Sequence, residues 1–219
     1  MSIIYKVYDI NIIECSKQNY TLEVYMDKNE LDKLIDNLYL DEIIELDEIP
    51  ELDLYMDQVI QLFENKYNKT LRTEEDKVLT KTMINNYAKD KIFMPIKNKK
   101  YSKEHLILIS LIYELKGSLS ISDIKKVLTP IVSTLNNNEE YDIRNLYRDY
   151  TEVYGEDVNL FKESAADRLK YIEDKLKIEK GILDGFNRKL ILLSSLVNMS
   201  NFYRRLAEKV VDDINSSDK

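Results

Sequence analysis

Lysine, asparagine and threonine side chains gather within residues 79–91 at the spacing of one helix face. At about 100° per residue, one side of this segment is apolar and the other is polar. The polar side holds no acid and consists of Lys81, Thr82, Asn85, Asn86 and Lys89. Lysine and threonine contact phosphate oxygens, and an asparagine amide can bond to the edge of an adenine base. The spacing therefore predicts a helix that faces nucleic acid. The alternative is an ordinary amphipathic surface helix, although such a helix usually mixes acids with its lysines.

A short basic tip follows this helix. Pro95 ends helical structure, and residues 97–100 read Lys-Asn-Lys-Lys, as expected for a wing between apolar residues. Residues 77–103 thus contain eight lysines and one acid. The side chains that we expect to contact DNA are Thr80, Lys81, Thr82, Asn85, Asn86, Lys89, Lys91, Lys97, Lys99, Lys100, Tyr101 and Lys103.

Charge is spread unevenly along the 219 residues. The formal net charge of −8, taken as a whole, disfavours a nucleic-acid partner. Residues 1–60 hold fifteen acids and four lysines, whereas residues 77–103 carry a net charge of +7. This placement favours an anionic partner for the basic block. The alternative is a solvated, lysine-rich loop in a chain that uses lysine heavily.

The single cysteine and single histidine exclude several kinds of site. Cys15 and His105 are too few for a zinc site of the Cys/His type, and one cysteine cannot form an intrachain disulfide. The four glycines form neither a Walker loop nor a dinucleotide-binding loop. We expect no cofactor, no metal site and no catalytic residue. We expect His105 to be half exposed rather than in contact with phosphate.

The chain shows no targeting or membrane-spanning pattern. Residues 1–6 have no basic region ahead of their apolar residues, and the longest apolar runs fall short of roughly 18–20 residues. We expect a cytoplasmic protein without membrane association, in which Cys15 is reduced.

Three prolines separate the periodic segments before and after the basic block. Residues 3–13 and 20–26 predict a small β-hairpin, and a short helix should follow to about residue 39. A second helix is predicted over residues 53–67. After the basic tip, Ser102 should cap an apolar, buried helix that Gly117 ends. Ser120 and Asp123 then open a helix to about residue 128, which Pro130 closes.

This order of helix, basic wing, apolar helix and short capped helix resembles the winged helix-turn-helix of MerR-type transcriptional regulators. Their recognition helix reads Ser-x-x-Thr-Ile-Arg-Tyr-Tyr-Glu, and the matching run here is Thr80-Lys81-Thr82-Met83-Ile84-Asn85-Asn86-Tyr87. Asn85 stands where the family has Arg, Asn86 replaces its first Tyr, and the link from the preceding helix is longer. The resemblance implies a recognition helix in the major groove of double-stranded DNA.

Residues 50–130 are also similar to a family of Gram-positive bacterial proteins that is described only as a domain of unknown function and is thought to include MerR-like regulators. The chain is thereby divided into an acidic segment (1–49), a winged helix-turn-helix domain (50–132) and a C-terminal helical domain (133–219). The expected fold class is mainly α, a MerR-like winged helix-turn-helix followed by a helical bundle or dimerisation region.

The C-terminal part should be helical over residues 139–152, 158–180 and 182–215, with Gly155 breaking the first of these patterns. Apolar residues at 183, 186, 190, 193 and 197 have the 3-4-3-4 spacing of a coiled-coil seam. Residues 190–197 are apolar nearly all round, which predicts burial between helices or subunits. This part is interpreted as a dimerisation bundle, an effector pocket for a small molecule, or simply a helical core.

The sequence supports two hypotheses of function. The first is a sequence-specific, MerR-like DNA-binding regulator that forms a homodimer through its C-terminal helices. The second is a non-enzymatic, helical protein-interaction module whose basic face docks an acidic partner. An enzyme is not expected, because no pair of acids lies in a setting that would tune it.

Overall fold

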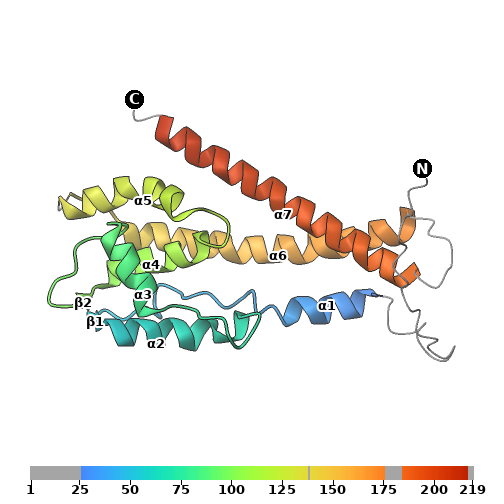
Figure 1. The fold of residues 1–219 in the computed structure, drawn as a ribbon, viewed down its shortest axis with the longest axis horizontal. Helices are drawn as coiled ribbons and strands as arrows, with labels where there is room; N and C mark the ends of the chain where they lie inside the picture. The colour runs from blue at the N-terminus through green and yellow to red at the C-terminus, as the bar shows by residue number, and fades with distance from the viewer. Residues whose placement is uncertain (1–25, 138, 176–183, 217–219) are drawn as a thin grey trace, which may run out of the picture.

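The fold is mainly helical, as predicted. The computed structural model describes residues 26–137, 139–175 and 184–216, so the hairpin predicted over residues 3–13 and 20–26 lies outside the described residues apart from Met26. Figure 1 shows an elongated molecule with one long helix, α6, along most of its length. The helices are α1 (Lys28–Asp36), α2 (Met56–Tyr67), α3 (Lys81–Lys89), α4 (Lys103–Leu115), α5 (Ile121–Asn136), α6 (Ile143–Lys175) and α7 (Asp184–Ser216); η1 (Asn68–Thr70) is a 3-10 turn, and β1 (Leu54–Tyr55) and β2 (Lys100–Tyr101) are strands.

Two separate apolar cores hold these elements together. The first core surrounds the buried α4 and combines side chains from residue 44 to residue 147. The second core is small and joins α1 and α7 to the distal half of α6 through Leu31, Ile35, Ala165, Leu169, Ile172 and Leu192. Because α6 contributes to both cores, it links the two ends of the molecule.

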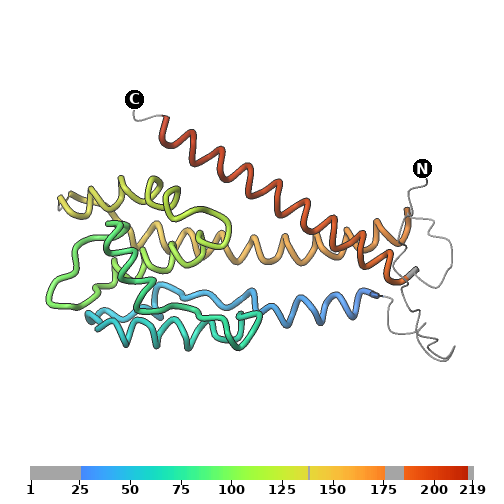
Figure 2. Tube along the Cα trace, viewed as in Figure 1, coloured from blue at the N-terminus to red at the C-terminus, as the bar shows by residue number. Residues whose placement is uncertain are grey.

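The helix predicted near residue 27 is α1. Asp27 accepts a hydrogen bond from the backbone N–H of Glu30, and Glu30 accepts one from the backbone N–H of Asp27. This reciprocal capping box satisfies two backbone donors at the start of the helix. The next 17 residues, 37–53, run between α2 and α6 without regular structure of their own (Figure 2).

Two buried tyrosines hold the backbone of this connecting segment. The N–H of Ile44 donates to the hydroxyl oxygen of Tyr67 at 3.3 Å, and the hydroxyl of Tyr147 donates to the carbonyl oxygen of Ile44 at 2.6 Å. An unpaired backbone group at this buried position would destabilise the fold. The tyrosines therefore allow an irregular segment to lie inside the first core.

The helix predicted over residues 79–91 is α3. Thr80 caps it, since its hydroxyl oxygen accepts a hydrogen bond from the N–H of Met83. No helix begins at Thr73, although its N–H donates to the Asp76 carboxylate. The helix ends in a Schellman motif, in which Lys91 adopts a φ of 57° and Ile92 donates to the carbonyl of Tyr87.

The basic tip forms a tight turn. The N–H of Lys100 donates to the carbonyl of Lys97, and Asn98 and Lys99 have φ values of 52° and 59°, as in a type I′ turn. The strand that follows pairs antiparallel with β1, so that Leu54 lies opposite Tyr101. This sheet thus brings the turn against the start of α2.

Two predicted helix boundaries are wrong. Pro130 lies inside α5, which continues to Asn136, because its ring faces outward and only one intrahelical hydrogen bond, to Lys126, is lost. Gly155 lies inside α6, which is continuous from Ile143 to Lys175. A domain boundary after residue 132 would cut through α5.

The last helix, α7, packs against α6 near its own start and against α5 near its own end (Figure 1). Of the predicted seam, residue 183 lies outside the described residues, and Phe186, Leu190, Leu193 and Val197 are exposed. Within residues 190–197 only Leu192 is buried. The described parts of the chain therefore do not bury this segment, which was predicted to be buried between helices or subunits.

The continuity of α6 through Gly155 can be tested by replacing this residue with alanine. A Cβ atom added at Gly155 meets no atom within 4 Å. Because glycine lowers helix stability relative to alanine, we expect Gly155→Ala to raise the free energy of unfolding by about 0.5–1 kcal/mol in urea denaturation. Gly117→Ala, which lies outside the helices, is the matched control and should lack this gain. A destabilised Gly155→Ala variant would contradict a continuous helix.

Candidate functional site

The polar face of α3 is exposed over its whole length. Lys81, Thr82, Asn85, Asn86 and Lys89 all face solvent. The opposite side of the helix is anchored in the first core by Ile84 and Tyr87. Thr80 is half-buried, and its hydroxyl is engaged in capping the helix. The amphipathic pattern thus gives an outward face of two amides, two ammonium groups and a hydroxyl.

The turn that follows extends this cationic surface. Lys91, Lys97, Asn98 and Lys99 are exposed, and the loop from α3 to β2 lies at the same end of the molecule as α3 (Figure 1). We use the name basic face for the exposed part of α3 together with Lys91, Lys97, Asn98, Lys99 and Lys100.

Two contacts restrain lysines of the basic face. The ammonium group of Lys81 forms an ion pair with Asp57 of α2 at 2.7 Å, and both side chains are largely exposed. Such an exposed pair contributes little to stability, so a phosphate could replace the carboxylate. The ammonium group of Lys100 lies 5.2 Å from the ring centroid of Tyr55, within cation–π range.

Two of the predicted contact residues do not belong to this surface. The side chain of Tyr101 is 1% exposed, because its ring packs edge-on against Phe93 and His105. Lys103 is 6% exposed, and its ammonium group forms an ion pair with Glu51 at 2.7 Å. Tyr101 and Lys103 were predicted from their place in the basic block, and burial removes both from the basic face.

The buried ammonium group of Lys103 belongs to a network of charges. Arg144 of α6 binds Glu51 at 3.1 Å and Glu104 at 2.9 Å. The hydrogen bond from Lys103 is the main reason that the pKa of Glu51 is lowered. Burial alone would raise the pKa of Glu104, but hydrogen bonds from its own backbone, Ser102 and Arg144 hold it below the usual value. The network joins the segment before β1, the start of α4 and the start of α6.

Sequence reasoning missed this network because its members are far apart in the chain. Arg144 is separated from Glu51 by 93 residues and from Glu104 by 40 residues. No local spacing relates such positions. The one available signal was the pair Lys103 and Glu104 in the first turn of an apolar helix, where a buried lysine needs a carboxylate.

His105 is buried, not half exposed as predicted. It is 7% exposed, its Nδ1 accepts the N–H of Ser102 at 3.1 Å, and its Nε2 lies 3.2 Å from the carbonyl oxygen of Met94. These partners require a neutral ring with its proton on Nε2. Burial lowers the pKa of His105, although the Met94 carbonyl acts in the opposite direction. His105 thereby fixes Met94 and Ser102, which lie at the two ends of the segment that contains the turn at residues 97–100.

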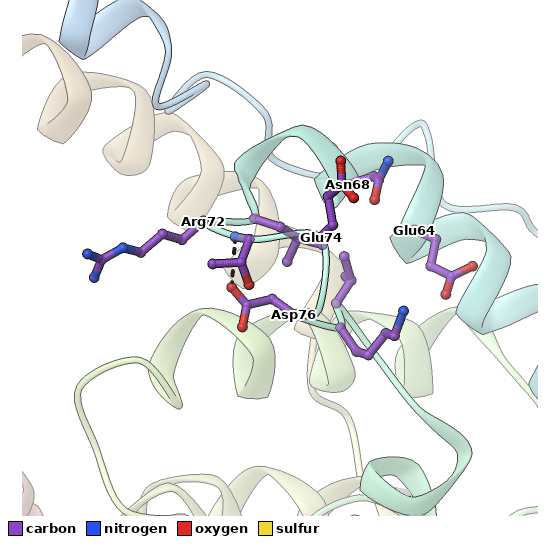
Figure 3. Close-up of a pocket in the computed structure, with 9 residues that line it drawn as sticks. Glu64, Asn68, Arg72, Glu74 and Asp76 are labelled. Atoms are coloured by element: carbon purple, nitrogen blue, oxygen red, sulfur yellow. Dashed lines mark hydrogen bonds between the residues drawn. The ribbon is translucent and has the colours of Figure 1, made fainter.

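The polar pocket formed by the end of α2 and the loop that follows it offers no convergent set of catalytic groups. It has a volume of about 340 Å³ and is lined by the loop over residues 71–78. Figure 3 shows that Arg72 extends away from Glu64 and Asp76. Across the described ranges, no group of three or more His, Cys, Asp or Glu side chains is placed to hold a metal ion. In those same ranges no helix has the length and apolar character needed to cross a bilayer.

The role of His105 predicts a dependence of stability on pH. A histidine whose pKa is lowered in the folded state stabilises the fold above its ordinary pKa of about 6.5 and loses this contribution as the pH falls. We expect the melting temperature to decrease between about pH 8 and pH 5 more steeply in the wild type than in His105→Gln. The carboxylates of Glu104 and Asp53, which also act on this ring, are present in both proteins. If the melting temperatures of the two proteins change equally with pH across this range, the assignment of this role to His105 is wrong.

Comparison with known proteins assigns a family to the central part of the chain and leaves its function open. Neither the curated proteins nor the solved structures contain a match to the chain. Residues 44–150 match a family described as a domain of unknown function. The matched range coincides with the first core, whose buried residues run from Ile44 to Tyr147. The chain therefore carries a domain of unknown function (DUF1836) at residues 44–150.

Proposed function

We propose that the protein is a sequence-specific DNA-binding regulator of the MerR-like winged helix-turn-helix type. The observation that carries the proposal is the basic face, where an exposed helix presents Asn85 and Asn86 between lysines and without an acid of its own. In this arrangement the asparagines read base edges in the major groove, and the lysines neutralise phosphates.

The turn at residues 97–100 acts as the wing in this proposal. Its exposed lysines contact the DNA backbone beside the groove that α3 enters. His105 and the pairing of β2 with β1 hold the base of this turn, which supports a fixed distance between the two contacts. Tyr101 and Lys103 act behind the surface, as a packed ring and a buried ion-pair partner.

The proposed regulator is a homodimer that pairs through α7. The support is the exposed seam of Phe186, Leu190, Leu193 and Val197, which keeps coiled-coil spacing on one side of the helix. Exposed apolar side chains in such number on one helix are typical of an interaction surface. Two copies related by a two-fold axis would recognise a pseudo-palindromic operator.

Binding of the purified chain to genomic DNA fragments tests the proposal. We expect selective enrichment of a few fragments, and an affinity whose logarithm falls with the logarithm of salt concentration at a slope of about −5 per chain, if six lysines meet phosphates. Those six are Lys81, Lys89, Lys91, Lys97, Lys99 and Lys100.

Two double variants separate base reading from phosphate binding. Replacing Asn85 and Asn86 with alanine should reduce the preference for the selected fragment by about 1–3 kcal/mol per lost bidentate contact and leave the salt slope unchanged. Replacing Lys97 and Lys99 with alanine should weaken binding to every sequence and make the slope shallower by about 2. Lys170→Ala, at an exposed lysine of α6 away from the basic face, is the control. Absence of a DNA complex together with stoichiometric capture of an acidic protein would replace this proposal with an interaction module.

The dimer is tested by a charge within the seam. Leu193 is 58% exposed, so Leu193→Glu should leave the helical content unchanged. In sedimentation equilibrium, we expect the wild type to be a dimer and Leu193→Glu to be a monomer, because the carboxylate would be desolvated at the interface. Leu52→Glu, at another exposed leucine outside α7, is the matched control and should remain a dimer. A monomeric wild type at high concentration would refute pairing through α7.

A further inference from the structure

A cleft separates α5 from the segment that follows α3. One wall is formed by the end of α3 and by Phe93, Met94 and Pro95, and the other by α5 around Val132. Its volume of about 650 Å³ lies within the range of small-molecule sites. We use the name α5 cleft for this space.

The walls of the α5 cleft are mainly apolar, and its charged lining residues are all cationic. Lys91 stands at the end of α3, and Lys125 stands on α5. Neither lysine forms an ion pair with another of the described residues. Thr129 and Ser133 add hydroxyl groups on the α5 side. The lining therefore suits an anion that has an apolar body.

The neighbouring hollow differs from the α5 cleft in its charge. Beyond Met94, Pro95 and Asn136, which line both spaces, a second hollow of about 470 Å³ is lined by Asp53 and Glu104 as well as by Lys97 and Lys100. The acids and lysines of that hollow offset one another, whereas the charged lining residues of the α5 cleft are both lysines. A bound carboxylate is thus directed toward Lys91 and Lys125, and its apolar body toward Met94 and Pro95.

The wall that carries Lys91 is held in place before any ligand binds. The Schellman motif fixes the backbone of Lys91, Phe93 is buried in the first core, and the Met94 carbonyl lies 3.2 Å from Nε2 of His105. A prearranged wall avoids part of the ordering cost of binding.

We propose that the α5 cleft binds a small aromatic carboxylate between Lys91 and Lys125, and that this ligand opposes DNA binding. The second half rests on the proposed function. Lys91 belongs to both the α5 cleft and the basic face. An ammonium group that neutralises the carboxylate is less available to a phosphate, so the two ligands weaken each other reciprocally.

Binding is measured by calorimetry and ligand-observed NMR on the full chain, with phenylacetate, benzoate and indole-3-acetate as probes. We expect saturable binding of at least one carboxylate and an affinity about tenfold lower for the matching neutral amide, since a charge-assisted contact is lost. Failure of all three probes to saturate at about 10 mM, or equal affinities of acid and amide, would overturn the proposal.

Variants place the ligand in the α5 cleft. Lys125→Ala should weaken binding about tenfold, and Ser133→Phe should abolish it by filling the space. Lys91→Gly removes the other ammonium group and suits the positive φ of that residue. Lys126→Ala, one position along α5 and outside the lining, is the control. Unchanged affinity in Lys125→Ala and Ser133→Phe, with circular dichroism showing folded proteins, would exclude this site.

The link to DNA is tested separately. At the probe concentration that half-saturates the wild type, we expect DNA binding of the wild type to weaken and that of Lys125→Ala, which then holds little probe, to change much less; without probe, the two proteins should bind DNA with equal affinity. If the probe binds while DNA affinity stays constant, the regulatory half is wrong. If no DNA complex forms in any condition, the proposed function fails and the α5 cleft is judged by the binding data alone.

Discussion

The charge of Lys103 is the constraint around which the DUF1836 domain is arranged. An ammonium group removed from water destabilises a fold by several kcal/mol unless a carboxylate faces it. Glu51 supplies that carboxylate, and Arg144 connects it to Glu104. Satisfying one buried charge thereby joins the segment before β1, the first turn of α4 and the beginning of α6. The first two of these adjoin β2, the strand that follows the turn at residues 97–100.

Local signals predicted the elements that stand closest to the basic face. Ser120 was identified as the start of a helix from its type and position, and it caps α5 in the structure. The exposure of Asn85 and Asn86 likewise follows from the periodicity of their own helix. Such features depend on a few neighbouring residues, so one sequence is enough to find them.

The errors arise where distant residues decide the outcome. Gly155 and Pro130 weaken a helix by amounts that a long packed helix can absorb, and α6 and α5 are both held by side chains from other segments. Tyr101 and Lys103 have the composition of a binding surface, but Phe93 and Glu51 draw them inward. Composition shows how much charge a segment carries, whereas tertiary packing selects which charges reach the solvent.

The uninterrupted course of α6 gives the molecule a rod of fixed length. Thirty-three residues of helix correspond to about 50 Å at about 1.5 Å per residue. One end of this rod is set into the first core and the other into the second, where α7 begins. The distance between the turn at residues 97–100 and the start of α7 is therefore fixed by a helix rather than by a loop. In a homodimer, the number of residues in α6 would then determine the spacing of the two basic faces.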